Sequence, residues 1–365
     1  MEQIKSIAKN FRIEGNVLSA EDYGCGHINT TFLINTDKNN SYILQKINTA
    51  IFTNPNELMS NINNVTNYLS DVILKEGDDP QRGVLHIIPS TDGDLYISSE
   101  SGTWRMFSFV NDSVTFQIIE HPEDFYYTGK AFGKFTRQLN DYPADTLYET
   151  IKNFHNTPSR YNDFENAVAQ NASGKAESAA KEIEFVRSRK DFCSLFTDKI
   201  SDHTLPLRVT HNDTKLNNVL FDKTTVKPVA VVDLDTVMPG LSLYDFGDAI
   251  RFGTNPAAED ENDIAKVYCD LNLFEAFARG YLEECGHLLT QEEIAMLPYA
   301  GKMMTLECGM RFLADHIAGD VYFKIHRENH NLDRCRTQFK LVKDMEDKEE
   351  QIKDIINKLC AEIGI

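Results

Sequence analysis

Two polar motifs, each following a short apolar stretch, constrain this chain more than any other feature. Residues 209–221 read VTHNDTKLNNVLF, which has the form H-x-D-x-x-x-x-N between apolar segments. Residues 231–235 read VVDLD and place a carboxylate at the end of another apolar stretch, twenty positions beyond Asp213. Each motif alone recurs by chance. The ordered set, with every member at the edge of a strand, is specific to one kind of scaffold.

The chemistry of these residues matches phosphoryl transfer. Such a site needs a carboxylate that accepts the proton of the attacking hydroxyl, together with an amide and a carboxylate that hold magnesium. Asp213 is the expected catalytic base. Asn218 and Asp233 are the expected magnesium ligands, because Mg²⁺ prefers hard oxygen donors. Asp235 either shares the metal-binding face or caps the following turn, and His211 is expected to brace the loop.

Composition describes an ordinary folded chain and narrows its partners. The 365 residues are 41% hydrophobic and 25% charged, with a net charge of −19. This charge argues against nucleic acid and anionic membranes as partners, but magnesium and local donors still allow ATP. No apolar stretch approaches the ~20 residues of a membrane span. Seven scattered cysteines without a C-x-x-C pair, and no secretory signal, lead us to expect reduced thiols in a cytoplasm.

The first part of the chain reads as strands with one helix. Asn54, Pro55 and Glu57 form a helix start, with an N-cap, a first-turn proline and a third-position acid. Alternating apolar residues and turn signals predict strands at 17–22, 28–35, 42–47, 84–88, 94–98 and 103–110.

The remainder is mainly helical. Helices are predicted at 125–140, 175–190, 263–285, 291–317 and 334–363, with short strands at 207–210, 219–221 and 229–232. We therefore predict an α+β, two-lobed, protein-kinase-like fold. A small N-terminal antiparallel-sheet lobe with one helix, including the hinge, would occupy residues 1–110. A larger helical lobe carrying the catalytic loop would occupy residues 111–365.

Nucleotide contacts are expected from three places in the first lobe. Gly24 and Gly26 flank a short G-x-G loop where a phosphate-covering segment belongs, although the motif lacks its third glycine. Strand alternation lets only one of Gln45 and Lys46 face the nucleotide, and the sequence leaves open which one. Adenine is expected at the 106–110 hinge, which contains Phe107 and Phe109.

Several longer segments carry a family resemblance. They are GCGHINTT at 24–31, WRMF at 104–107, FHNT at 154–157, THNDTKLNNVL at 210–220, DLDTVMPGLSLYDFGDAIRF at 233–252 and MRFLADHIAGDVYF at 310–323. With these segments the chain resembles the aminoglycoside phosphotransferase and choline kinase superfamily, and within it the N-acetylhexosamine 1-kinases. The resemblance implies ATP- and Mg²⁺-dependent phosphorylation of the anomeric hydroxyl of N-acetylglucosamine or N-acetylgalactosamine.

The same resemblance implies a set of sugar contacts. His27, Phe252, Arg311 and Tyr322 fall where this family meets its sugar. Other readings stay open at this stage. They are a kinase of the same architecture for an amino alcohol, aminoglycoside, methylthioribose or homoserine, a non-catalytic nucleotide-binding scaffold, and a metal-dependent hydrolase. The choice between sugar epimers, the nucleotide preference and the oligomeric state are also open.

Overall fold

The computed structural model describes residues 1–24 and 28–365, which form two compact units. The first unit comprises residues 1–115, 141–152 and 219–238, and the second comprises residues 116–140, 153–218 and 239–365. The first long segment thus ends close to the predicted hinge at 106–110. Two later segments of the chain return to complete the first unit.

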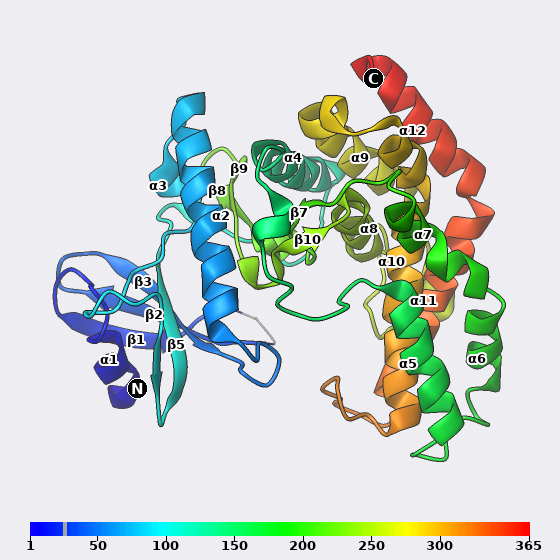
Figure 1. Ribbon diagram of the computed structural model, residues 1–365, viewed down its shortest axis with the longest axis horizontal. Coiled ribbons are helices and arrows are strands. Elements are labelled where there is room, and N and C mark those ends of the chain that lie inside the picture. Colours follow the sequence, from blue (N-terminus) through cyan, green and yellow to red (C-terminus); the bar gives the residue numbers. More distant parts are fainter. Residues whose placement is uncertain (25–27) are drawn as a thin grey trace. The chain divides into compact units, whose positions relative to one another are not determined.

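A five-stranded antiparallel sheet, in the order β1-β2-β3-β5-β4, dominates the first unit (Figure 1). Its strands are β1 Val17–Asp22, β2 Thr30–Thr36, β3 Ser41–Ile47, β4 Ile97–Ser99 and β5 Gly102–Ser108. One face of the sheet buries Phe32, Leu44 and Trp104 against the short helix α1 (Glu2–Ala8). This antiparallel lobe and the helical second unit confirm the predicted α+β fold class.

Two of the predicted strands were wrong in extent. Residues 84–88 join the sheet only through an isolated bridge from Ile87 to Phe107. Pro89 follows directly and has no N–H to donate, so a ladder cannot continue there. The strand predicted at 94–98 is confined to β4, because the chain is still leaving the turn at Gly93, where φ is +99°.

Helix α2 (Pro55–Glu76) of the first unit starts where the sequence predicts. The Asn54 side chain accepts a hydrogen bond from the Glu57 N–H, and Pro55 occupies the first turn. The apolar stripe predicted for this helix is buried along its length. A second sheet in this unit, β6-β8-β9, consists of Ser113–Val114, Val219–Asp222 and Pro228–Val231, and the four-residue helix α3 spans Pro80–Gly83.

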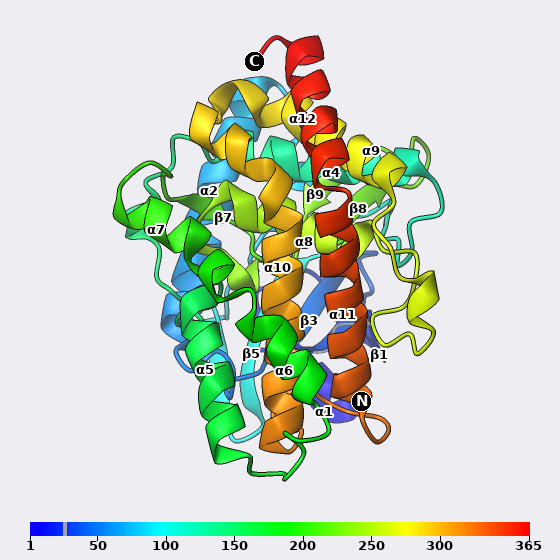
Figure 2. The same ribbon diagram turned by 90° about the vertical axis from the view of Figure 1, so that its right-hand side faces the viewer.

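Helices make up most of the second unit (Figure 2). They are α4 Pro122–Gln138, α5 Thr157–Gln170, α6 Ala180–Arg187, α7 Leu195–Ser201, α8 Ser242–Gly253, α9 Leu271–Cys285, α10 Gln291–Ala318, α11 His330–Asp347 and α12 Glu349–Ile363. The long helix α10 begins with a reciprocal capping box between Thr290 and Glu293. It contributes Leu306, Met310 and Leu313 to the core of the unit.

Three predicted helices have different boundaries in the structure. Helix α9 begins at Leu271 rather than 263, because the Asp270 side chain caps it by accepting from the N–H groups of Asn272 and Leu273. The helix predicted at 334–363 is divided at Lys348 into α11 and α12. The segment predicted as helix at 175–190 is helical only in α6, after the turn at Gly174, where φ is +72°.

The described cysteines agree with the expectation of reduced thiols. The six cysteines that it contains are all free thiols, and five of them are buried. They pack as small apolar side chains. None of the described helices combines the length and apolar character needed to cross a membrane.

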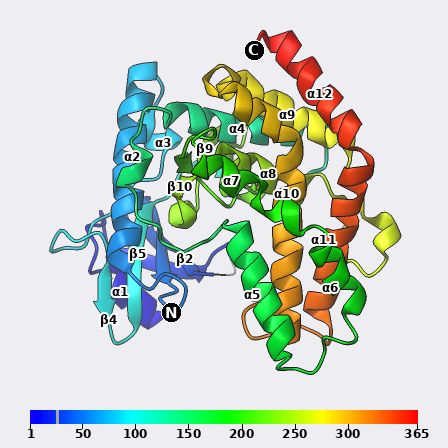
Figure 3. The same cartoon turned by 45° about the vertical axis from the view of Figure 1, so that its right-hand side comes forward.

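Helices α4 and α9 approach each other through glycines (Figure 3). A Cβ atom at Gly129 would clash with the carbonyl oxygen of Phe277, and one at Gly280 would clash with that of Tyr126. Both obstacles are backbone atoms, which cannot move aside without displacing a helix. Glycine at these positions therefore sets how closely the two helices pack.

We predict that Gly280→Ala destabilises the protein even though alanine favours helix formation. Overpacking costs about 1–3 kcal/mol, which exceeds the ~1 kcal/mol that alanine gains over glycine in a helix. Chemical denaturation would measure the change, with the exposed Asn272→Ala on the same helix as control. A Gly280→Ala variant at least as stable as the wild type would show that the helices can separate freely.

Candidate catalytic loop and acceptor site

The loop that follows β7 (Arg208–Thr210) brings the predicted base and one predicted metal ligand together. The Asn218 side-chain amide donates to the Asp213 carbonyl oxygen at 2.8 Å and to Asp213 Oδ2 at 3.0 Å. The Asp213 N–H donates to Nδ1 of His211, whose ring is buried against Phe132 and Phe135 of α4. His211 thus braces the loop, as expected. The amide nitrogen of Asn218 binds Asp213, so its side-chain oxygen takes no part in these two contacts.

Two buried carboxylates of α8 accept hydrogen bonds from the backbone of this loop. Asp245 accepts the backbone N–H groups of His211 and Asn212 at 2.8 and 2.7 Å. Asp248 accepts the Thr214 N–H and forms an ion pair with Arg251. Burial raises the pKa of Asp245 to about 6, although the His211 side chain and the two N–H groups oppose that rise. Both carboxylates therefore have a structural role in holding the loop.

Lys215 is a candidate functional residue that we did not single out in the sequence. Its ammonium lies 2.5 Å from Asp213 Oδ1, and about a third of each side chain is exposed (32% and 27%). Burial alone would raise the pKa of Asp213, but the charge and hydrogen bond of Lys215, together with His211 and Asn218, outweigh this effect and hold that pKa below its usual value. Its position two residues after Asp213 was the available signal. Asp213 is therefore ionised and paired with a cation.

The remaining predicted metal ligand lies in the first unit. Asp233 follows β9 in the left-handed conformation, with φ 60° and ψ 58°, and its side chain is exposed. Aspartate tolerates this conformation better than most residues, and such positions concentrate at functional sites. Asp235, two residues later, is only 4% exposed. The two carboxylates of this motif therefore have different surroundings.

Magnesium fits the donors that the chain offers. Among residues 1–24 and 28–365, no group of three or more His, Cys, Asp or Glu side chains could hold a metal ion. Asn218 and Asp233 offer an amide oxygen and a carboxylate, which are the donor types that Mg²⁺ prefers.

The register of the main sheet shows which predicted nucleotide residue faces the α2 side. Gln45 pairs with Arg105 across β3 and β5, and its side-chain oxygen accepts two hydrogen bonds from that guanidinium. Lys46 lies on the opposite face, exposed, with its ammonium 5.8 Å from the Trp104 ring. Gln45 and Lys46, the two alternatives for facing the nucleotide, therefore lie on opposite faces of the sheet.

The other predicted nucleotide contacts are only partly visible. Gly24 adopts φ +77°, a conformation that favours glycine, whereas Gly26 and His27 lie outside the described residues. Phe107 is buried beneath the Arg105 guanidinium, and Phe109 packs edge-on against Tyr23.

Arg311 lies in an aromatic cluster of the second unit. Its guanidinium carbon is 5.6 Å from the ring centre of Phe154, 5.9 Å from that of Tyr322 and 5.5 Å from that of Phe323. We call these four residues the Arg311 cluster. Within the described part of the chain, the half-buried Arg311 has no hydrogen bond or ion pair. The structure thus places the two predicted sugar contacts Arg311 and Tyr322 together.

His155 links this cluster to the catalytic loop. Its Nδ1 is 2.8 Å from Oε1 of the buried Glu307, and its Nε2 is 3.3 Å from the carbonyl oxygen of Asn212. Glu307 also accepts from the Thr157 hydroxyl. Arg311 follows Glu307 by four residues on α10, so the two side chains lie on the same face of that helix. The FHNT segment signalled this region, but the role of His155 in it was not apparent.

Asp315 fixes the loop that carries Tyr322. It is buried at the end of α10 and accepts the backbone N–H groups of Val321, Tyr322 and Phe323 at 2.8–2.9 Å. Its Oδ2 also accepts from the Asn331 side chain. The conformation of residues 321–323 therefore depends on one carboxylate.

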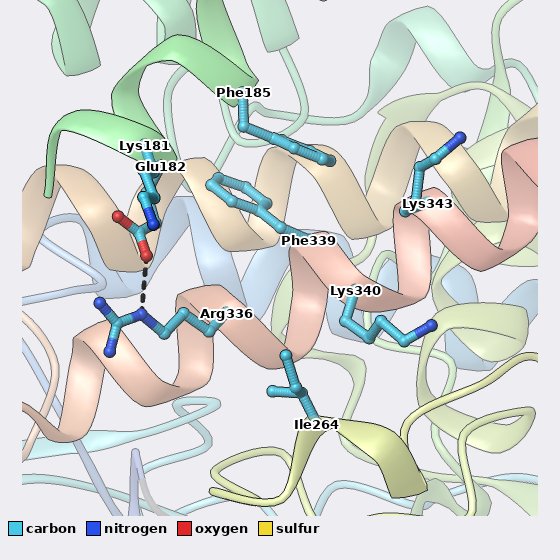
Figure 4. Close-up of a pocket in the computed structure, with 8 residues that line it drawn as sticks. All are labelled: Lys181, Glu182, Phe185, Ile264, Arg336, Phe339, Lys340 and Lys343. Atoms are coloured by element: carbon cyan, nitrogen blue, oxygen red, sulfur yellow. Dashed lines mark hydrogen bonds and ion pairs between the residues drawn. The ribbon is translucent and has the colours of Figure 1, made fainter.

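Phe252 and a surface groove share no described contact with the Arg311 cluster. Phe252 is half-buried in the last turn of α8, and no ring contact joins it to Arg311 or Tyr322 in the described structure. A groove of about 320 Å³ between α6 and α11 centres on the stacked rings of Phe185 and Phe339 (Figure 4). It contains none of the residues that the sequence predicts for catalysis or binding.

Comparison with known proteins identifies the family. Residues 20–283 match the phosphotransferase enzyme family, a span that includes the catalytic loop and Asp233. The chain therefore belongs to this family and is a small-molecule kinase with the kinase-like fold described above.

Solved structures share the fold across almost the whole chain. A microcompartment-associated aminopropanol kinase superposes with a TM-score of 0.63 at 16% identity, covering 96% of this chain and 98% of that one. A spectinomycin phosphotransferase solved with ADP and spectinomycin gives 0.58 at 13% identity, covering 96% and 98%. An amicoumacin kinase solved in complex with AMP-PNP, Ca²⁺ and Ami gives 0.59 at 13% identity, covering 95% and 93%. At these identities the likeness concerns the fold.

We predict that Asp315→Asn loosens the 321–323 loop. An amide presents one oxygen where the carboxylate presents two, so at least one buried N–H loses its acceptor, at a cost of about 1–3 kcal/mol. Hydrogen exchange should show faster exchange of the three backbone amides. Asp347→Asn, which removes an exposed carboxylate from α11, serves as control. Unchanged protection at 321–323 would mean that the loop is held by other contacts.

Proposed function

We propose that this kinase transfers the γ-phosphoryl group of ATP to the anomeric hydroxyl of an N-acetylhexosamine, giving the sugar 1-phosphate. The observation that carries the proposal is the Arg311 guanidinium, which contacts three aromatic rings and no acceptor among the described residues. Arginine presents five donors in a fixed planar fork, and half-buried donors need acceptors. A ligand rich in oxygen acceptors would supply them.

Charge favours a neutral acceptor over an amine. A cationic substrate placed beside Arg311 would be repelled. Arg160 adds a second positive charge near Arg311. Burial and then the charge of Arg311 lower the pKa of Arg160, which shows that the two guanidinium groups repel each other. Aminopropanol kinase, whose fold is similar, acts on a molecule that carries an amino group. The residues around Arg311 favour a hydroxylated, uncharged molecule instead.

The aromatic members of the cluster suit a pyranose ring. Phe154, Tyr322 and Phe323 offer ring faces, and Tyr322 is 60% exposed. Such faces pack against the apolar side of a sugar, while the guanidinium binds neighbouring hydroxyl or acetamido oxygens. Together with the extended motif resemblance, this supports an N-acetylhexosamine acceptor.

The loop residues supply the transfer chemistry. In the proposed step the sugar O1–H bond breaks, its proton passes to Asp213, O1 bonds to the γ-phosphorus and the bond from that phosphorus to ADP breaks. Asp213 is ionised and thus able to accept the proton. Lys215 orients the carboxylate through Oδ1 and places a positive charge beside the reacting groups.

Asn218 and Asp233 are the residues that would hold magnesium. When bound, Mg²⁺ neutralises the phosphate oxygens of the nucleotide. Asn218 is oriented for this role by its two contacts with Asp213, and Asp233 by the left-handed turn after β9.

A substrate panel tests the proposal directly. ADP release would be measured with N-acetylglucosamine, N-acetylgalactosamine, unmodified hexoses, choline and an aminoglycoside. We expect the highest kcat/KM with an N-acetylhexosamine and a glycosyl phosphate product, identified by phosphorus NMR coupling to the anomeric proton. Preference for choline or the aminoglycoside would favour the amine-kinase alternative. Phosphorylation at O6 would reject the 1-kinase assignment.

We predict that Arg311→Ala lowers kcat/KM for the sugar by about ten- to hundredfold, since unpaired polar groups of the ligand cost about 1–3 kcal/mol. The KM for ATP should stay within twofold of the wild-type value. Arg279→Ala, which removes a partly exposed arginine on α9 paired with Glu275 and Glu362, is the matched control. Normal sugar kinetics in a folded Arg311→Ala variant would place the sugar elsewhere.

We predict that Asp213→Asn lowers kcat by on the order of 10²–10⁴, because proton acceptance is lost while size and hydrogen bonding are kept. Nucleotide affinity should be preserved, as measured by ADP calorimetry. Wild-type turnover in this variant would remove Asp213 from the mechanism.

Lys215→Met should change the pH profile as well as the rate. Without the ammonium, burial acts with less opposition and raises the pKa of Asp213. The low-pH limb of the kcat profile should therefore move to higher pH. The control Lys199→Met removes a lysine that pairs with Glu292 away from the loop. An unshifted acid limb would show that Lys215 does not set the ionisation of the base.

A further inference from the structure

Two charged side chains are buried in the described part of the first unit, and they contact each other. Arg105 of β5 is 1% exposed and Asp235 is 4% exposed. Arg105 Nη1 lies 2.5 Å from Asp235 Oδ1, as an ion pair without the angles of a hydrogen bond. Burying both charges requires such a pairing, because either one alone would be strongly destabilising.

Each partner is fixed by further hydrogen bonds. The remaining guanidinium nitrogens, Nε and Nη2, donate to Gln45 Oε1 at 3.0 and 2.8 Å, and Gln45 donates in turn to Thr31. Asp235 Oδ2 accepts from the Asn29 side chain at 2.6 Å. The pair therefore joins β2, β3 and β5 to the turn that contains Asp235.

That turn carries the proposed metal ligand. Asp233 directly precedes the 3₁₀ turn Leu234–Thr236, which contains Asp235, and the Asp235 carbonyl oxygen accepts from the Thr150 hydroxyl. Just beyond the turn, the Val237 carbonyl oxygen accepts from Asn61 of α2. The exposed Asp233 carboxylate thus lies next to a turn that contacts with Arg105, Thr150 and Asn61 of the first unit hold in place.

The sheet has no lysine on this face at β3. Lys46 lies on the opposite face beside Trp104, and Gln45 takes the position next to Arg105. The buried cation therefore comes from β5, and it contacts a carboxylate in the metal-binding motif itself.

We propose that the Arg105–Asp235 pair is a positioning device that holds Asp233 in place as a metal ligand, and that Asp235 does not itself bind the metal. This inference rests on the proposed function through the role of Asp233. Both oxygens of Asp235 already have partners, whereas Asp233 is exposed. Residues that orient metal ligands in this way change metal affinity by about 10–100-fold when they are removed.

The test measures metal binding without turnover. Free Mn²⁺, detected by electron paramagnetic resonance, would be titrated against the full chain with saturating ADP, and thermal unfolding would be recorded in parallel. We expect Asp235→Asn to weaken Mn²⁺ binding by about tenfold, within the range for residues that orient ligands. Asp233→Ala should weaken it further. The control Asp222→Asn disrupts the more exposed Arg82–Asp222 pair of the same unit and should leave Mn²⁺ affinity unchanged.

A double variant separates positioning from folding. Arg105→Met with Asp235→Leu removes both buried charges, so thermal stability should recover relative to the single variants. Mn²⁺ affinity should remain weak, because the link from the sheet to the turn is gone. This variant also decides the matter if Asp235→Asn does not fold.

Several outcomes would overturn the inference. Wild-type Mn²⁺ affinity in Asp235→Asn or in the double variant would show that the pair only stabilises the fold. A loss in Asp235→Asn as large as that in Asp233→Ala would make Asp235 a direct ligand. If the wild-type chain bound no Mn²⁺ with ADP, the proposed function would fail first, and the role of this pair would fail with it.

Discussion

The buried Asp245 carboxylate is the constraint on which the catalytic loop depends. It accepts two consecutive backbone N–H groups, those of His211 and Asn212. With the loop fixed in this way, the Asn212 carbonyl oxygen is placed for His155, and His155 in turn contacts Glu307. A chain of short polar contacts thus connects the proposed base to the helix that carries Arg311. The burial that raises the pKa of Asp245 also keeps these contacts away from competing water.

The fold class could be predicted because local signals and burial agree. Asn54 and Pro55 start a helix in any context that permits one, and the structure keeps that start. The predicted boundaries of helices and strands were wrong where a single side chain or backbone angle decides where the element begins or ends. The Asp270 cap moved the start of α9, and Pro89 ended strand pairing after residue 88. The hydrophobic periodicity that predicts an element gives little information about such single-residue boundary signals.

The candidate site was only partly predictable, for a different reason. The motif spacing indicated Asp213 and Asn218, which the structure brings into hydrogen-bond contact. The partners of His155, Glu307 and Asn212, are distant from it in sequence. Lys215 is only two residues from Asp213, but the sequence does not show that its side chain turns toward that carboxylate. The choice between Gln45 and Lys46 depended on strand register, which a sequence with apolar residues on both faces does not specify. Side-chain pairings across neighbouring strands therefore could not be predicted from the sequence and required the structure.

Helix α10 carries Glu307, Arg311 and Asp315 at intervals of four residues. Side chains at this spacing form one stripe along the helix, here about 12 Å long at ~1.5 Å per residue. One end of the stripe contacts the loop-bracing histidine, the middle contributes the guanidinium, and the other end holds the Tyr322 loop. Since the outer two positions keep the scaffold in place, the middle position can change chemically with little effect on either. Under the proposed role of Arg311 in binding the acceptor, a substitution at this one position would change acceptor preference while the loop that carries Asp213 stays intact.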